Sequence, residues 1–207
     1  MGQTWQEPRR PPGKGSSVAE NAATVRRPAA RGGRLAPLAV LGLAAVVAAG
    51  VVAWLLLRGT GGGGVAVQPA TLVSQAQLQQ LAASVDHPVY WAGPKSGYSY
   101  ELTTTSNGRF YVRYLPAGVK AGDTRPNFLV VGTYTQPGSY AALKRAAKRD
   151  GSVTLSIDNG GLALFSSKAP TSAYFSYPDA KYQVEVYDPS GDHARKLVVA
   201  GQIVPIK

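Results

Sequence analysis

Residues 35–57 constrain this chain more than any other feature. Their sequence, LAPLAVLGLAAVVAAGVVAWLLL, runs for 23 residues without a charged side chain, between Arg34 and Arg58. An α-helix of this length extends roughly 34 Å, and the hydrocarbon core of a bilayer is about 30 Å thick. A core helix of a soluble protein usually keeps polar residues along one side, and this stretch has none. The sequence therefore predicts a transmembrane helix at 35–57, with the lipid bilayer as its partner.

The charges that flank this stretch predict its direction. Residues 1–34 hold seven basic and two acidic residues, and four of the basic ones lie within nine residues of the stretch. Lys and Arg beside a span remain on the cytoplasmic side. We therefore expect a single-pass protein of the cell membrane, with its N-terminus in the cytoplasm and its C-terminal domain outside. The alternative is a cleaved signal peptide, whose apolar core is usually shorter, at about 7–15 residues.

Composition predicts what lies on either side of the span. Residues 1–34 are rich in Pro, Gly and Ser with few apolar side chains, so we expect a disordered, basic cytoplasmic tail. Residues 58–69 contain the run GTGGGG, which is typical of a flexible linker. Residues 70–207 are numerous enough to form one extracytoplasmic domain with its own core.

Residue usage excludes several kinds of site. The chain has no cysteine, which removes disulfides, thiolate metal ligands and cysteine nucleophiles. It has two histidines, His87 and His193, too few for a multi-histidine metal site. We therefore expect no metal and no cofactor. The net charge of +11 is shared between the tail and the outer domain, and no RNA-binding motif is present. The basic surface favours an anionic wall polymer or lipid headgroup over nucleic acid.

The spacing of apolar residues predicts an α+β domain. We expect helices at 71–85, 139–150 and 190–200, with strands at 88–92, 98–102, 110–114, 128–134, 153–157, 162–166, 173–177 and 182–187. Asn107-Gly108 is a hairpin dipeptide that tolerates positive φ at both positions. Tight turns join most strands, which predicts a mostly antiparallel sheet with two or three packed helices. The Tyr-rich hairpins at 97–118 and 171–191 resemble each other and indicate an internal two-fold duplication.

The densest group of polar and aromatic residues contains His87, Tyr90 and Trp91. As a binding site, the two aromatic rings would form a stacking platform, with His87 as an acid, base or hydrogen-bond donor. The alternative is that His87 ends a helix, Pro88 starts a strand, and the two aromatic residues pack in the core. A hydrolase near His87 would need a hydroxyl and an orienting carboxylate beside the ring. The sequence contains neither GxSxG nor SxxK, so we expect a binding role before an enzymatic one.

The spacing of apolar residues predicts which residues of two helices point inward: in the helix expected at 139–150 they are Tyr140, Leu143 and Ala147, and in the helix expected at 190–200 they are Leu197 and Val198. A second candidate surface lies on the other side of the helix expected at 139–150. Its outward side carries four cations, Lys144, Arg145, Lys148 and Arg149. Such a face is often only solvated, but it also suits contact with anionic lipid or wall polymer.

Several blocks of the outer domain resemble a known family. They are DHPVYWAGPKSGYSYELT, GRFYVRYLPAGV, RPNFLVVGTYTQP and YQVEVYDPS. This part of the chain resembles an uncharacterised family of single-pass envelope proteins of high-GC Gram-positive bacteria. The resemblance implies a location in the bacterial cell envelope and assigns no role to any residue.

Three functions are compatible with the sequence. The first is a binding or scaffolding domain that contacts a wall component, a peptide or an envelope protein. The second is the hydrolase near His87. The third is a structural subunit of a membrane complex, for which Ala45, Ala49 and Ala53 provide a small-residue seam within the span.

Overall fold

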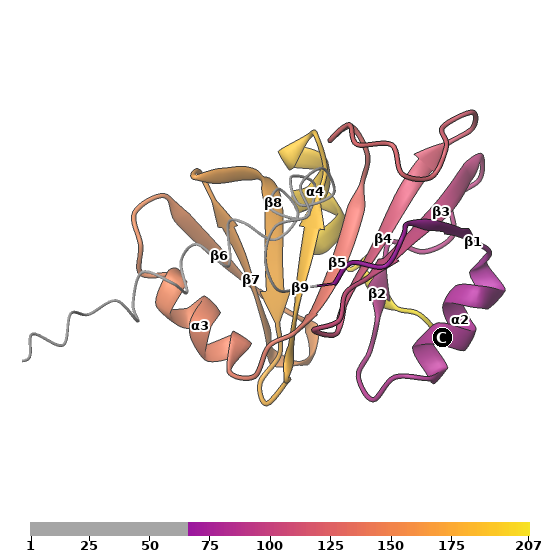
Figure 1. Ribbon diagram of the computed structural model, residues 1–207. Coiled ribbons are helices and arrows are strands. Elements are labelled where there is room, and N and C mark those ends of the chain that lie inside the picture. Colours follow the sequence, from indigo (N-terminus) through magenta and orange to yellow (C-terminus); the bar gives the residue numbers. More distant parts are fainter. Residues whose placement is uncertain (1–65) are drawn as a thin grey trace, which may run out of the picture. The chain divides into compact units, whose positions relative to one another are not determined.

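The computed structural model describes residues 66–207 (Figure 1). The predicted tail, the predicted span and most of the predicted linker lie outside the described residues. Within 66–207, no helix is long and apolar enough to cross a membrane. The described residues contain an eight-stranded sheet, a two-stranded sheet and three α-helices, and all strand pairs are antiparallel. The predicted α+β class with a large antiparallel sheet is confirmed.

The elements follow one another in the order β1 (Thr71–Val73), α2 (Gln75–Ala83), β2 (Tyr90–Trp91), β3 (Tyr98–Thr104), β4 (Arg109–Pro116), β5 (Val130–Thr135), α3 (Ser139–Ala146), β6 (Ser152–Ile157), the 3₁₀ turn η1 (Asp158–Gly160), β7 (Gly161–Ser166), β8 (Ala169–Ser176), β9 (Tyr182–Tyr187), α4 (Gly191–Val199) and β10 (Val204–Pro205).

The large sheet has the strand order β1-β3-β4-β5-β9-β8-β7-β6. Strands β5 and β9 lie at its centre, and β5 falls within the strand predicted at 128–134 apart from its last residue. Strands β1 and β6 form its two edges, at opposite ends of the sheet in Figure 1. The small sheet pairs β10 with β2, and both of its strands are only two residues long.

The two faces of the large sheet bury different side chains. The first face carries residues such as Tyr100, Val112 and Val186, and α2, α4, β2 and the residues on either side of β10 contribute to its core. The second face carries Leu164 and Tyr174, which pack against Leu143 and Ala146 of α3. It also carries buried charged residues on β3, β4 and β9. Because side chains alternate along a strand, this division assigns every strand residue to one face.

The helix predicted at 71–85 begins later than expected. Residues Thr71–Val73 form β1, paired with β3, and the helix starts after Ser74. The Ser74 hydroxyl accepts from the Gln77 N–H, and the Gln77 side chain accepts from the Ser74 N–H. This capping box defines the start of the helix, so the three preceding residues are available for the sheet.

The turn at Asn107-Gly108 also differs in detail from the prediction. Gly108 has a φ of +72°, and Asn107 has no positive φ. The Thr105 N–H donates to the Arg109 carbonyl at 3.1 Å, and the Gly108 N–H donates to the Thr105 carbonyl at 3.0 Å. The hairpin therefore closes through a three-residue loop, in which only the last residue needs the left-handed conformation.

Candidate functional site

His87 lies between α2 and β2 and is half-buried. Its ring packs edge-on against Phe110 at 5.6 Å and lies near the Tyr182 ring at 6.4 Å. Nδ1 is 3.1 Å from the Pro88 carbonyl oxygen, and Nε2 is 3.2 Å from Thr135 Oγ1. The ring therefore links the segment before β2 to the end of β5.

The surroundings of His87 contain one of the two groups that a hydrolase requires. Thr135 supplies a hydroxyl, but this hydroxyl also lies 3.1 Å from the Gly108 carbonyl, to which it donates. A backbone carbonyl, that of Pro88, orients Nδ1, and no carboxylate among residues 66–207 hydrogen-bonds to the ring. A Thr–His pair without an orienting carboxylate is poorly arranged to produce a nucleophile.

Tyr90 and Trp91 lie in the core of the first face, with 4% and 5% of their surfaces exposed. Trp91 packs edge-on against Tyr100, and Tyr90 packs edge-on against Phe175. Burial raises the pKa of Tyr90, and the hydrogen bond with the Tyr182 hydroxyl raises it further. These rings offer no joint stacking surface to solvent. Tyr90 also lines a cleft, which is described below.

The helix expected at 139–150 ends at Ala146, so of its four predicted cations only Lys144 and Arg145 lie on α3, and Lys148 and Arg149 follow it in a turn. Lys144, Arg145, Lys148 and Arg149 are all exposed, and the opposite side of α3 is buried on the second face of the sheet. Leu143, predicted to point inward, is fully buried. Tyr140 and Ala147 were expected on the same inward side and are half-buried. The Lys144 ammonium lies 4.9 Å from the centre of the Tyr140 ring.

A buried ion pair on the second face was not anticipated. Glu101 of β3 and Arg113 of β4 are cross-strand partners, and their side chains are 3.4 Å apart. Both side chains are at most 1% exposed. The register of the β3–β4 hairpin is the signal in the sequence that pairs them. Their burial follows from the loop that lies above them.

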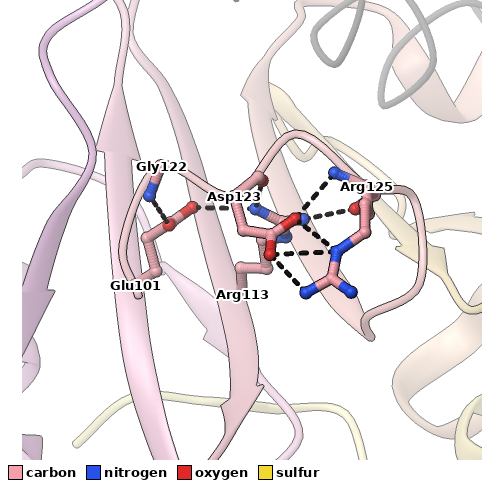
Figure 2. A network of polar contacts seen from close by, with 5 residues as sticks. All are labelled: Glu101, Arg113, Gly122, Asp123 and Arg125. Carbon is pink, nitrogen blue, oxygen red and sulfur yellow. Dashed lines mark hydrogen bonds and ion pairs between the residues drawn. The ribbon is translucent and has the colours of Figure 1, made fainter. Parts of the chain in front are cut away.

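Figure 2 shows how this ion pair holds the loop at 117–127. The Arg113 guanidinium donates to the carbonyls of Asp123 and Arg125, and Glu101 Oε2 accepts from the Gly122 N–H at 2.6 Å. The Asp123 carboxylate in turn binds the Arg125 guanidinium. These hydrogen bonds lower the pKa of Asp123 to about 2. The network positions the loop above the sheet.

A second buried carboxylate lies on β9. Glu185 accepts hydrogen bonds from the Tyr134 hydroxyl and, at 2.9 Å, from the Ser172 hydroxyl. Burial and the charge of Glu185 both raise the pKa of Tyr134. Glu185 thereby links β5 and β8 across β9.

His193 begins α4 in a cluster that sequence reasoning also missed. Its Nδ1 is 2.7 Å from Asp188 Oδ2, and Asp188 Oδ1 accepts from the Ser190 N–H. Ser190 Oγ accepts from the His193 N–H at 3.4 Å. No hydroxyl among residues 66–207 hydrogen-bonds to Nε2, so the cluster caps the helix and forms no catalytic triad.

A cleft lies on the first face between the end of β6 and the end of α4. It has a volume of about 390 Å³ and is lined by residues 155–159, 198–201 and 203–205, together with Tyr90, Phe175 and Tyr177. Three apolar residues at its margin are unusually exposed, Val199 at 53%, Val204 at 39% and Leu155 at 39%. Exposed apolar side chains around a hollow are typical of a binding site.

The electrostatics of the cleft favour a positive ligand group. Asp158 is the one charged residue in its lining. The C-terminal end of α4, at Val199, also borders the cleft, and a helix presents partial negative charge at this end. The cleft thus combines apolar walls with one negative side.

A smaller hollow of about 290 Å³ lies at the other end of β6. Its lining includes Val153, Phe165 and Arg195, and the Arg195 guanidinium stands over the Phe165 ring at 4.8 Å. Both hollows therefore border β6.

Comparisons with known proteins add no relative: no family model, no curated sequence and no solved structure matches the chain. Among residues 66–207, no group of three or more His, Cys, Asp or Glu side chains is arranged to hold a metal ion.

Proposed function

We propose that this protein is a membrane-anchored, extracytoplasmic binding protein of a bacterial cell envelope. In this proposal residues 35–57 span the membrane and 58–69 link the span to the outer domain. The cleft between β6 and α4 receives an apolar side chain of a partner polypeptide, next to a positively charged group of the same partner.

The observation that carries this proposal is the composition of the cleft. Val199, Val204 and Leu155 expose apolar surface around a hollow large enough for a bulky side chain. Exposing such surface to water is unfavourable by about 25 cal/mol per Å², so a matching apolar group gains free energy on entering. Asp158 and the end of α4 add a preference for a cation, such as Lys, Arg or a terminal amine.

A fluorescent label in the cleft tests this function directly. The chain has no cysteine, so Val199→Cys provides a single labelling site in the full-length protein reconstituted in nanodiscs. We expect short peptides with Leu or Phe beside Lys to change the fluorescence saturably, and peptides with Glu in place of Lys to bind less well. Asp158→Asn should weaken the binding of the Lys peptides by about two- to fivefold.

The matched control carries the label at Ala141→Cys, an exposed position on α3. A response of equal size there, or equal affinity for the Lys and Glu peptides, would contradict the assignment of the cleft. The membrane topology is tested separately, because protease added to intact cells should digest residues 70–207 and spare residues 1–34.

The four exposed cations on α3 and in the turn that follows it support a second candidate, contact with an anionic polymer. Soluble polyphosphate serves as the probe for the full-length protein in nanodiscs of zwitterionic lipid. Each Lys or Arg near an anionic surface contributes about 1 kcal/mol. Replacing Lys144, Arg145, Lys148 and Arg149 with Gln should therefore reduce binding by tenfold or more, and unchanged binding would exclude this role.

The surroundings of His87 do not support the hydrolase alternative, because its ring is oriented by a backbone carbonyl. His87→Ala should therefore leave any ester, glycan or peptide turnover of the preparation unchanged.

We also propose that the domain contains an internal duplication, although its two repeats do not match the two Tyr-rich hairpins to each other. In the sheet order β3-β4-β5-β9-β8-β7, three strands that are consecutive along the chain run from each end toward the centre. A helix follows the central strand of each set, β5 or β9. This order supports an equivalence of β3-β4-β5-α3 with β7-β8-β9-α4.

A further inference from the structure

Strand β6 is an open edge of the large sheet. It pairs with β7 on one side, and no strand among residues 66–207 pairs with its other side. The four residues from Val153 to Ser156 are all exposed. In an antiparallel strand every second residue directs its N–H and C=O to the outer side. The outer side of β6 therefore offers a row of hydrogen-bonding groups to another strand.

The sequence of β6 lacks the usual protection of such an edge. Natural edge strands carry Lys, Pro or an inward-pointing charge, which prevent pairing with another chain. Residues 152–157 read SVTLSI and contain none of these. The opposite edge, β1, has only three residues. The domain therefore has one long, uncharged edge that can receive a strand.

We propose that this edge binds the same edge of a second copy of the chain. The two β6 strands pair antiparallel about a two-fold axis at Leu155, and the two large sheets become continuous. This inference goes beyond the proposed function, because it needs no ligand in the cleft.

In this register the alternating apolar and hydroxyl residues of one β6 strand lie opposite residues of the same kind in the other. Leu155 lies opposite the partner's Leu155, and Val153 lies opposite the partner's Ile157. Thr154 lies opposite the partner's Ser156. Apolar residues thus meet on the first face and hydroxyls meet on the second, which is the kind of cross-strand pairing that stabilises sheets.

Three neighbouring registers are less favourable. A shift by one residue places apolar residues opposite hydroxyl residues along the whole strand. A two-fold axis at Thr154 keeps the alternation but places Asp150 opposite the partner's Asp158, and like charges in this arrangement repel. With the axis at Leu155, Asp158 instead lies opposite the partner's Ser152.

The proposed β6–β6 contact is small and joins only two copies. Each copy has one β6, so the two-fold pairing ends at a dimer and forms no fibre. A contact over six residues is smaller than a standard protein interface of about 1,600 Å². We therefore expect the dimer where copies are concentrated, and two chains anchored in one membrane meet that condition.

Because Leu155 also lines the cleft, the axis brings the two clefts of the dimer near each other.

Disulfide trapping tests the register in the full-length protein in lipid vesicles. Opposed residues of an antiparallel pair have Cα atoms about 4.5–5.5 Å apart, within the range of a disulfide. Under mild oxidation, Leu155→Cys should therefore form a covalent dimer. Val153→Cys is the matched control on the same strand and face, because the proposed register separates the two cysteines by about 14 Å. The double variant Val153→Cys/Ile157→Cys should crosslink.

A charge at the edge tests the pairing without a crosslink. Thr154→Lys should abolish the Leu155→Cys dimer and leave the fold intact, because Thr154 is exposed. Ala141→Lys adds the same charge on α3 and should leave the dimer unchanged. Equal crosslinking of Leu155→Cys and Val153→Cys, no crosslinking of Leu155→Cys, or a dimer insensitive to Thr154→Lys would each overturn the proposal. The peptide response at Val199 is measured separately, so failure of the cleft and failure of the edge are distinguishable.

Discussion

At the scale of single residues, Arg113 shows why a buried charge depends on its partners. Its guanidinium is 1% exposed and reaches Glu101 and two carbonyls of the loop at 117–127. Removing one member of a buried pair leaves the other charge in a poorly solvated site, whereas replacing both members often costs little. The loop and the ion pair therefore stabilise each other.

Two variants separate these contributions. Arg113→Met should lower the free energy of unfolding by about 3–5 kcal/mol, because the Glu101 carboxylate loses its cation. The double variant Glu101→Gln/Arg113→Met should be more stable than Arg113→Met. Urea denaturation followed by circular dichroism measures both values, and a double variant that is less stable than the single one would refute this account.

Asp123 provides a test by pH at the same loop. Arg125 lowers the pKa of Asp123 from 3.8 to about 2, so the carboxylate stabilises the folded protein above about pH 4. This contribution is lost as the pH falls from 3.8 toward 2, because the folded protein then takes up the proton that the unfolded chain already carries. Arg125→Ala should return the pKa of Asp123 toward 3.8 in a carbon-13 NMR titration. An unchanged pKa in this variant would assign the shift to another group.

Single residues also show the limit of prediction from sequence. The inward positions Leu143, Leu197 and Val198 were predicted correctly, because apolar residues at helical spacing identify the buried side. The burial of Glu101 was not predicted, since an isolated charge in an alternating strand usually marks a solvent face. What buries it is a loop that follows β4, and no local pattern shows where a loop will lie.

At the scale of elements, the contact between α4 and β8 depends on a glycine. A Cβ atom at Gly191 would lie 1.8 Å from the Pro170 carbonyl oxygen, so the first residue of α4 touches the backbone beside it. The register of α4 on β8 follows from this approach together with the buried residues Ala194, Leu197 and Val198.

Gly191→Ala should consequently displace the start of α4. Forcing an extra carbon into a packed site costs about 1–3 kcal/mol. Asp192→Ala, one residue further and exposed, is the control and should cost less than about 1 kcal/mol. Thermal unfolding compares the two variants, and equal melting temperatures would show that the backbone adjusts freely.

Most helices and strands were predicted at nearly the right place, because hairpin turns and amphipathic spacing are local signals. Strand β10 was missed, since two residues carry no periodicity. The cleft was missed for a related reason. Its walls come from β6 and from the segment after α4, and only the strand order and helix packing bring these elements together.

At the scale of the whole molecule, buried tyrosines make the stability of the fold depend on pH in the alkaline range. Burial raises the pKa of Tyr90, Tyr114, Tyr134 and Tyr174 above the ordinary value of 10.0. Their neutral forms therefore stabilise the folded domain below pH 10, and this contribution is lost as the pH rises further.

Titration of tyrosine absorbance tests this coupling. The phenols of these four residues should ionise only as the circular dichroism of the sheet disappears. If all eleven tyrosines titrated together while the sheet remained intact, the described burial would be wrong.

The strand order has a consequence for the speed of folding. Strands β3, β4 and β5 are consecutive along the chain, as are β6 to β9, whereas β5 must find β9 across an intervening helix and three strands. Contacts between distant segments form slowly, because the entropy of closing a long loop opposes them. The two meanders should therefore appear early in refolding, and the β5–β9 seam should set the rate at which the domain is completed.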